Sequence, residues 1–316
     1  MSAGATASGQ RPGGALAYVR NALSGGGWLL LVIIALLGLA IGLPKLPVTR
    51  AAYDHLVIFD VSQSMGVEDY RIGEQPVSRL AFAKHAVAEA LKNPTCDTRI
   101  GWGVFAGRKI VTLLAPVEVC RNYSALLAAL DNIDGRMAFE RSSEIQEGLL
   151  WTMLNVRDLK PLPSVIFMTD GHEAPPLPPE RVRAYDGPLG EVRGWVIGVG
   201  GLEPQPIPKT DPDGRRIGTW RATEVLQWAG AASDTGGTSH EHLSELREPH
   251  LQRLAKTVGF DYARLVDAGS LEAALHDRRL SHPAVVETDL RWIPGLAALL
   301  LLAVWFRPDR RRPARV

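Results

Sequence analysis

The 316-residue sequence predicts an α/β fold in which a doubly wound, mostly parallel sheet is flanked by two transmembrane helices. Three observations lead to this prediction. Short apolar segments alternate with segments of helical periodicity through the middle of the chain, as they do in βαβ units. Two uncharged apolar runs lie on either side of that middle part. The composition, 46% apolar and 22% charged, is that of a packed protein and excludes a disordered chain.

The first predicted element is a transmembrane helix at residues 27–44, which contain the run WLLLVIIALLGLAIGL. With its flanking glycine residues, this run approaches the ~20 apolar residues that a bilayer core requires. The last predicted element is a second transmembrane helix at residues 291–306, where a Trp stands near each end and a basic tail follows. A cleaved signal peptide for the first run and a buried core helix for either run are the alternatives.

The distribution of charge predicts the orientation. Residues 1–26 and 307–316 are basic tails, and both are expected in the cytoplasm because positive charge beside a span stays on that side. Between the apolar runs, residues 51–289 carry 25 basic and 33 acidic groups, a formal charge of −8. Such an acidic part of the chain repels nucleic acid. We therefore expect residues 51–280 to form a periplasmic domain at a bacterial inner membrane.

Strands and helices alternate within this predicted domain. The expected strands are short apolar runs that suit burial on both faces, and the expected helices repeat apolar residues at three and four positions, with Ser78 as an N-cap. Residues 201–247 interrupt the alternation, and we interpret them as a surface insertion with a small hairpin at 211–220. The predicted strands are 55–60, 99–105, 110–114, 164–168, 192–199 and 260–265, and the predicted helices are 79–91, 123–132, 143–156, 249–258 and 271–276.

Two cysteine residues flank the predicted hairpin at 99–105 and 110–114. In an antiparallel pair the numbers of facing residues have a constant sum, which a turn between Gly107 and Arg108 sets near 215. Cys96 and Cys120 sum to 216, so they are expected to face one another and to form a disulfide. This bond requires an oxidising compartment, in agreement with a periplasmic domain. Two free buried thiols are the alternative.

Five oxygen-bearing side chains follow predicted strands or open a predicted helix. Asp60, Ser62 and Ser64 form a D-x-S-x-S motif after the first strand, Asp170 follows the strand 164–168, and Ser143 begins a helix. Ligands of open α/β sheets collect at the carboxyl ends of strands. These hard oxygen donors favour Mg²⁺ first, then Mn²⁺ or Ca²⁺. The alternative is that the serines cap helices and the carboxylates bind no metal.

This pattern resembles the von Willebrand factor A domain and its metal-ion-dependent adhesion site. The resemblance implies that Asp60, Ser62, Ser64, Ser143 and Asp170 hold a divalent cation. It also implies that the hydroxyls bind the ion directly, that the carboxylates bind partly through water, and that one position stays open for an acidic group of a protein partner. The family has Thr where this chain has Ser143, and Ser142 is the alternative ligand.

Longer segments are similar to bacterial membrane-anchored A domains of the Bat type. FMTDGHEAPPLP, APVEVC and EHLSELREPHLQRLA further resemble the MxaL-type proteins that are encoded with methanol dehydrogenase in methylotrophs. This resemblance implies a role in maturation of periplasmic methanol dehydrogenase, including its supply of calcium. The partners that it implies are the dehydrogenase, other maturation proteins and a MoxR-type ATPase.

No motif of a hydrolase or a nucleotide-binding enzyme occurs in the sequence, so we expect a binding module rather than an enzyme. A general Bat-type envelope-stress scaffold with another client is one alternative. A metal-dependent hydrolase is another, for which His172 and Glu173 are the only nearby candidates for a general base. The segment His240-Glu241-His242 is expected to be a solvated loop.

Overall fold

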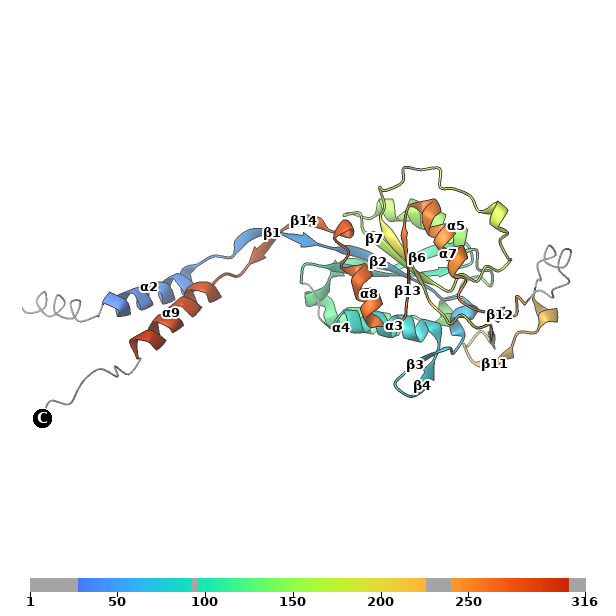
Figure 1. Ribbon diagram of the computed structural model, residues 1–316, viewed down its shortest axis with the longest axis horizontal. Helices are drawn as coiled ribbons and strands as arrows, with labels where there is room; N and C mark the ends of the chain where they lie inside the picture. The colour runs from blue at the N-terminus through green and yellow to red at the C-terminus, as the bar shows by residue number, and fades with distance from the viewer. Residues whose placement is uncertain (1–27, 93–95, 226–239, 307–316) are drawn as a thin grey trace, which may run out of the picture. The chain divides into compact units, whose positions relative to one another are not determined.

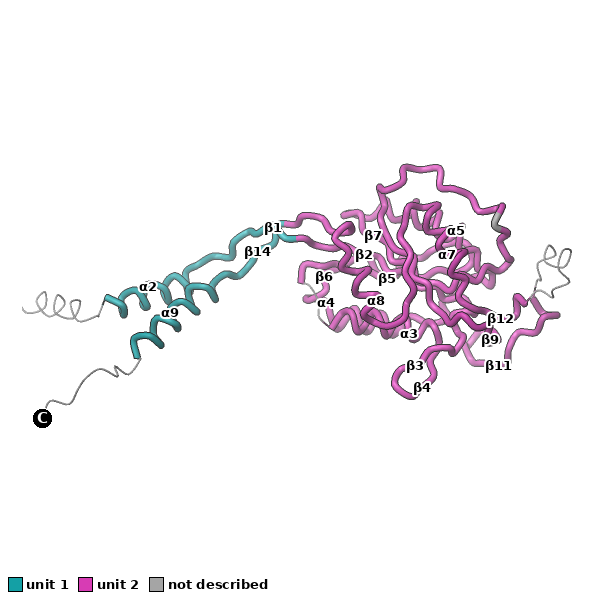
Figure 2. The backbone as a smooth tube through the Cα atoms, viewed as in Figure 1, with its two compact units in different colours: residues 1–50, 285–316 teal, residues 51–284 magenta. Residues whose placement is uncertain are grey.

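A computed structural model describes residues 28–92, 96–225 and 240–306. The chain divides into two compact units (Figure 2). Unit 1 comprises residues 1–50 and 285–316, and unit 2 comprises residues 51–284. The predicted terminal tails, 1–26 and 307–316, lie outside the described residues.

Unit 2 is built on a six-stranded sheet whose order is β13-β8-β7-β2-β5-β6. All neighbouring pairs are parallel except β5 and β6, which form an antiparallel hairpin. The chain leaves the central strand β2 toward β5 and β6, then continues on the other side of β2 with β7, β8 and β13. The predicted α/β class with a mostly parallel sheet is confirmed. The strands are β2 (Asp54–Asp60), β5 (Arg99–Ala106), β6 (Lys109–Glu118), β7 (Ser164–Thr169), β8 (Gly194–Gly198) and β13 (Asp261–Arg264).

Helices cover both faces of this sheet (Figure 1). On one face, apolar side chains of β2 and β5 pack with three helices around the fully buried Trp102, whose Nε1 donates to Leu126 O at 3.1 Å. On the other face, Phe105 and Phe167 pack against two helices. The first group is α3 (Arg79–Ala90), α4 (Val119–Asp131) and α8 (Ala268–Leu275), and the second is α5 (Ile145–Asn155) and α7 (Glu248–Val258).

The helix starts follow local capping. Ser78 caps α3 as predicted, because its Oγ accepts from Ala81 N at 3.1 Å. Helix α4 begins four residues earlier than the prediction, since the Glu118 carboxylate accepts from the amides of Cys120 and Arg121. A short hairpin, β3 (Tyr70–Ile72) and β4 (Gln75–Val77), precedes α3.

The hairpin of β5 and β6 brings the two cysteines together. Near its turn the pairing follows the predicted sum, with Phe105 opposite Ile110. Two irregularities then shift the register, so Arg99 lies opposite Glu118. Cys96 and Cys120 form a disulfide with a Cα–Cα distance of 5.4 Å. The predicted bond is confirmed.

The predicted insertion at 201–247 contains two small antiparallel pairs. One pair is β10 (Pro208–Thr210) with β11 (Arg216–Thr219). These strands form a small hairpin at 208–219, whereas the sequence analysis expected it at 211–220. The other is β9 (Gln205–Pro206) with β12 (Leu243–Ser244). At the amino end of the central strand β2, His282 Nε2 lies 3.0 Å from Asp54 Oδ2, so the first and last segments of unit 2 lie side by side.

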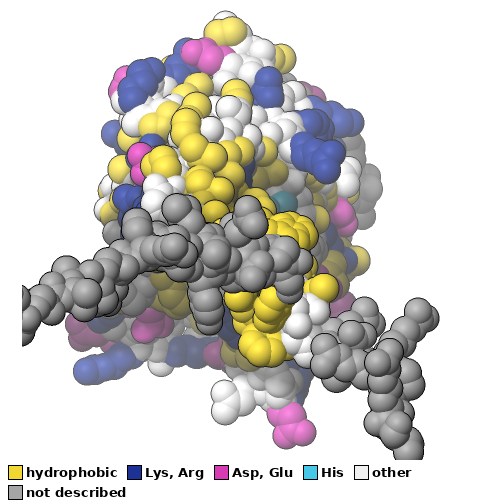
Figure 3. Space-filling view, turned by 90° about the vertical axis from the view of Figure 1, so that its left-hand side faces the viewer, with side chains coloured by type: hydrophobic (Ala, Val, Ile, Leu, Met, Phe, Trp, Pro, Cys, Tyr) yellow, Lys and Arg dark blue, Asp and Glu magenta, His cyan; other side chains and the backbone are white. Residues whose placement is uncertain are grey.

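Unit 1 contains the two apolar helices, α2 (Trp28–Gly42) and α9 (Trp292–Trp305), which lie side by side. Strands β1 (Leu46–Ala52) and β14 (His282–Thr288) pair with one another, and most residues of each belong to unit 1. Large apolar side chains on both helices are exposed, among them Ile41 at 81% and Leu299 at 64%. Hydrophobic side chains are prominent on the surface shown in Figure 3.

Neither apolar helix has the length that the sequence analysis predicted. Helix α2 has 15 residues and α9 has 14; at 1.5 Å per residue each covers only about 22 Å. Pro44 restricts the residue before it to extended conformations, which ends α2 early. Within the described chain, no helix is both long and apolar enough to cross a bilayer. The prediction of transmembrane helices at 27–44 and 291–306 is wrong for these residues.

Candidate metal centre

The predicted site lies where the chain reverses its direction of travel across the sheet. Asp60 is the last residue of β2, and Thr169 is the last residue of β7, its parallel neighbour. The carboxyl ends of both strands therefore meet at one edge, which is the usual binding edge of open α/β sheets. Asp170 follows Thr169 directly, and a single 3₁₀ turn (Gln63–Gly66) follows β2.

The first loop is folded around the Asp60 carboxylate. Its Oδ1 accepts from Ser62 N at 2.8 Å and its Oδ2 accepts from Thr169 Oγ1 at 2.7 Å. The hydroxyl oxygens of Ser62 and Ser64 lie 3.1 Å apart. Asp60 is completely buried, and Ser64 is nearly so. The D-x-S-x-S motif thus directs two hydroxyls to one point above a buried carboxylate.

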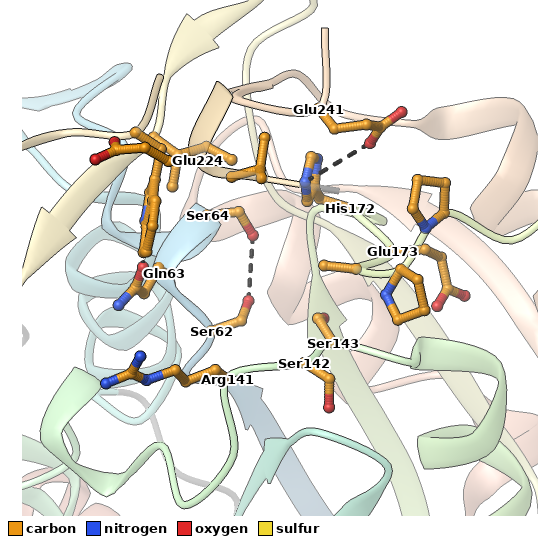
Figure 4. A pocket seen from close by; sticks show the side chains of 16 residues that line it. Ser62, Gln63, Ser64, Arg141, Ser142, Ser143, His172, Glu173, Glu224 and Glu241 are labelled. Atoms are coloured by element: carbon orange, nitrogen blue, oxygen red, sulfur yellow. Dashed lines mark hydrogen bonds and ion pairs between the residues drawn. The ribbon is translucent and has the colours of Figure 1, made fainter. Parts of the chain in front are cut away.

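The second loop presents Ser143 beside these hydroxyls (Figure 4). Its backbone is fixed by two hydrogen bonds with Ala174, both 2.8 Å long. Ser143 Oγ is buried and has no hydrogen-bond partner among the described residues. Ser142 differs, because it is half-buried and its hydroxyl donates to Glu140 at 3.4 Å. Ser143 is therefore the residue of this pair with a hydroxyl free for a ligand.

The third loop holds Asp170 in a buried ion pair. Asp170 Oδ2 accepts from Arg79 Nη1 at 2.7 Å and from Ser244 Oγ at 2.9 Å, while Oδ1 accepts from His172 N at 3.0 Å. The Arg79 side chain is fully buried and also donates to Asp69 Oδ2 through Nε (2.9 Å) and Nη2 (2.7 Å). The guanidinium thus joins α3, the third loop and the end of the insertion.

Burial and neighbouring charges shift the pKa values of Asp60 and Asp170 in opposite directions. Burial, together with the charge of Asp170, raises the pKa of Asp60 to about 7. Burial also acts to raise the pKa of Asp170, but the Arg79 guanidinium outweighs it and the net direction is downward. Arg79 is subject to a similar opposition. Burial acts to lower its pKa, but the carboxylates of Asp170 and Asp69 outweigh burial and the net direction is upward.

A divalent cation fits this set of groups. Asp60, Ser62, Ser64, Ser143 and Asp170 are all brought to the same edge, and every one offers a hard oxygen. Without a bound ion, the unpaired buried hydroxyl of Ser143 would lower the stability of the fold, since a buried polar group without a partner costs about 1–3 kcal/mol. The buried Asp60 carboxylate accepts hydrogen bonds from Ser62 N and Thr169 Oγ1, and neither of these donors carries a charge.

Four groups around the centre escaped the sequence analysis. Thr169 donates to Asp60, Arg79 and Ser244 donate to Asp170, and Asp69 accepts from the Arg79 guanidinium. The position of Thr169 before Asp170 is a local signal that could have been used. The Arg79 pair joins residues 91 positions apart, and no pattern in the sequence reveals it.

His172 and Glu173, the candidates for a general base, are buried and already engaged. The Glu173 carboxylate accepts from the amides of Ile145 and Gln146 at 2.8 and 3.2 Å, which caps the start of α5. Burial and the nearby Arg247 lower the pKa of His172 to about 4. Glu241 lies within 2.9 Å of Arg247, so the segment expected to be a solvated loop reaches the site.

A cavity of about 380 Å³ opens directly onto the centre. Ser62, Ser64 and Ser143 form part of its wall (Figure 4). Asp60 and Asp170 lie beneath these hydroxyls, completely shielded from solvent. Much of the remaining wall is apolar and comes from the segment after Asp170 and from the insertion.

No protein-family model matches the sequence, and no curated protein matches it. Among solved structures, an aerotolerance-related membrane protein from Bacteroides fragilis is similar, with 20% identity, 72% of this chain and 98% of that chain covered, and a TM-score of 0.49. A membrane-spanning protein from Vibrio fischeri has 20% identity, coverage of 70% and 94%, and a TM-score of 0.29. A von Willebrand factor type A protein from Catenulispora acidiphila has 13% identity, coverage of 75% and 45%, and a TM-score of 0.40.

Proposed function

We propose that unit 2 is a metal-dependent protein-binding module that captures an acidic side chain of a partner. The observation that carries the proposal is the buried, unpaired hydroxyl of Ser143, which faces the same cavity as Ser62 and Ser64. Together with Asp60 and Asp170, these residues would hold Mg²⁺, or Mn²⁺ or Ca²⁺ in its place. The bound ion supplies a positive charge that accepts a carboxylate oxygen from the partner.

The residues around the centre favour binding over catalysis. A hydrolase needs a base within reach of a water molecule. Glu173 is committed to the first amides of α5, and the ring of His172 lies between Arg247 and Glu241. The low pKa of His172, about 4, makes its ring a weak base, and Arg247 Nη2 lies 3.3 Å from its Nδ1. The module therefore holds a partner and does not transform it.

The disulfide and the apolar helices support a location outside the cytoplasm and at a lipid surface. The Cys96–Cys120 bond persists in oxidising compartments. The exposed Leu and Ile side chains of α2 and α9 form a large apolar surface, which soluble proteins rarely expose to water. We propose that these side chains insert into lipid. Flotation of the full chain with lipid vesicles tests this, and a chain that stays in the aqueous fraction contradicts it.

The resemblance to MxaL-type proteins specifies a client. On that basis we propose periplasmic methanol dehydrogenase, or a protein that acts with it during maturation and calcium insertion, as the partner. A general envelope scaffold of the Bat type would have the same metal centre and other clients. Capture of purified methanol dehydrogenase by the immobilised full chain, with Mg²⁺ and with chelator, separates the two functions.

Two neighbouring serines provide a matched test of the mechanism. Ser143→Ala removes the unpaired hydroxyl and is expected to abolish Mg²⁺-dependent capture of the partner. Ser142→Ala removes a hydroxyl that faces Glu140 and is expected to leave capture unchanged. Equal capture by both variants, with wild-type strength, would rule out a cation held at Ser143. Binding of Mn²⁺, followed by its paramagnetic resonance signal, reports on the ion without any partner.

A further inference from the structure

We propose that the cavity beside the metal centre is a second recognition subsite, which takes a bulky apolar side chain next to the captured carboxylate. The partner segment is then an acidic peptide in which Glu or Asp adjoins an aromatic or large aliphatic residue. This inference rests on the proposed function, because the carboxylate is the group that the metal centre would bind.

The wall of the cavity is suited to an apolar group. Pro175 and Pro176 form one part of it, and Ile207, Trp220 and Val225 of the insertion form another. The volume of about 380 Å³ falls in the range of about 300–1,000 Å³ that is typical of ligand pockets. A group placed here lies beside the serine hydroxyls, so adjacent residues of one peptide can reach both places (Figure 4).

The charges around the cavity favour an acidic occupant. Glu224 is paired with Lys209 at 3.0 Å, and Glu241 is paired with Arg247 at 2.9 Å. Arg141 also lines the cavity, but it makes no ion pair with any described residue. The third acidic group of the lining, Glu173, accepts from two backbone amides at the start of α5, so all three acidic groups have partners within the protein, whereas the Arg141 cation is left for a ligand. A second carboxylate of the peptide, or its free C-terminus, would form an ion pair with the Arg141 guanidinium.

Trp220 links the apolar wall to the metal loop. Its Nε1 donates a hydrogen bond to Gln63 Oε1, and Gln63 stands between the two serines of the D-x-S-x-S motif. Its backbone amide donates to Ile207 O at 3.0 Å, and Lys209 Nζ lies 4.5 Å from the centre of its ring. The indole is therefore held in place before a ligand arrives, which reduces the entropy lost on binding.

The experiment titrates the full chain, in detergent and with Mg²⁺, with three blocked hexapeptides. The probes are acetyl-Gly-Gly-Glu-Phe-Gly-Gly-amide and the same peptide with Ala in place of Phe or with Gln in place of Glu. The Glu-Phe peptide is expected to bind at least about tenfold more tightly than the Glu-Ala peptide, because the phenyl group is removed from water. The Gln-Phe peptide is expected not to bind.

Variants assign the preference to the cavity. Trp220→Ala is expected to remove the preference for Phe over Ala, while both Glu peptides still bind in a Mg²⁺-dependent manner. Its control is Ile217→Ala, which truncates an exposed residue of β11 outside the cavity. If Trp220→Ala does not fold, Val225→Ser serves the same purpose. Arg141→Ala is expected to leave the affinity of both blocked Glu peptides unchanged, because they carry neither a second carboxylate nor a free C-terminus.

The outcomes separate this inference from the function on which it rests. Equal, Mg²⁺-dependent affinity for the Glu-Phe and Glu-Ala peptides would overturn the subsite and leave the metal-dependent capture of carboxylates intact. A preference for Phe that survives both Trp220→Ala and Val225→Ser would also overturn it. Absence of binding by either Glu peptide in Mg²⁺ would contradict both proposals.

Discussion

Replacing Asp60 by Asn is expected to make the metal-free protein more stable at about pH 8, although it removes one ligand of the proposed metal centre. The Asp60 carboxylate is completely buried and faces the charge of Asp170, which raises its pKa from 3.8 to about 7. Since the folded state holds this proton more tightly than the unfolded chain does, the group stabilises the fold below about pH 4. That stabilisation is lost as the pH rises toward 7.

The size of the effect follows from the shift of about three pKa units. At 1.36 kcal/mol per unit, ionisation of Asp60 lowers the free energy of unfolding by the order of 4 kcal/mol. Asn cannot ionise, and its Oδ1 can still accept from Ser62 N. In chelator at about pH 8, Asp60→Asn should therefore exceed the wild type in stability by up to that amount. Near pH 4 the difference should vanish.

Urea unfolding of the full chain in detergent, with chelator and then with Mg²⁺, measures both parts of this prediction. Mg²⁺ should stabilise the wild type and leave Asp60→Asn unchanged, because a ligand that binds only the folded state raises its stability. Asp186→Asn, at an exposed loop position, is the control for a change of one charge. A variant that is less stable than wild type in chelator at about pH 8 would refute the reasoning about repulsion. Equal stabilisation of both proteins by Mg²⁺ would refute the assignment of Asp60 as a ligand.

Three further predictions concern groups away from the ion itself. Cys96→Ser should lower the free energy of unfolding by about 3 kcal/mol, because it opens a loop of 24 residues; urea unfolding checks this, and an unchanged midpoint contradicts it. Arg79→Met should lower the free energy of unfolding by about 3–5 kcal/mol, since it leaves the carboxylates of Asp69 and Asp170 buried without a counter-charge. Urea unfolding measures this change, and a decrease under about 1 kcal/mol would contradict the buried ion pairs of Arg79. Burial lowers the pKa of His55 from 6.5 to about 4, so the wild type should lose about 3 kcal/mol relative to His55→Gln as the pH falls from about 6.5 to 4. Parallel stability curves for these two proteins across that range would exclude a buried neutral His55.

The sheet could be predicted from the sequence because its signals are local. Runs such as HLVIFD and SVIFM are apolar at every position, which suits strands that are covered on both faces. The register of the β5–β6 hairpin followed from the position of its turn, and this placed the cysteines opposite each other. The two irregularities further from the turn, between Ile100 and Gly103, have no counterpart in the apolar pattern of the strand and were not predicted.

The limits of the prediction lie in contacts between distant parts of the chain. Arg79 looks like an ordinary helical residue in the sequence, and only the folded chain shows it between Asp69 and Asp170. The insertion gave no periodic signal, so its contribution of Ile207 and Trp220 to the cavity was hidden. For the apolar runs, hydrophobicity was predicted correctly but helix length was not, since the helix stops at Gly42 ahead of a proline.

The close approach of Asp54 and His282 has a consequence for how this protein can be engineered. Because unit 2 begins and ends at neighbouring points, a linker of a few residues could join its ends and allow a circular permutant with new termini in the exposed loop 186–190. The same arrangement means that the whole unit could be transplanted into a surface loop of an unrelated host without stretching either connection.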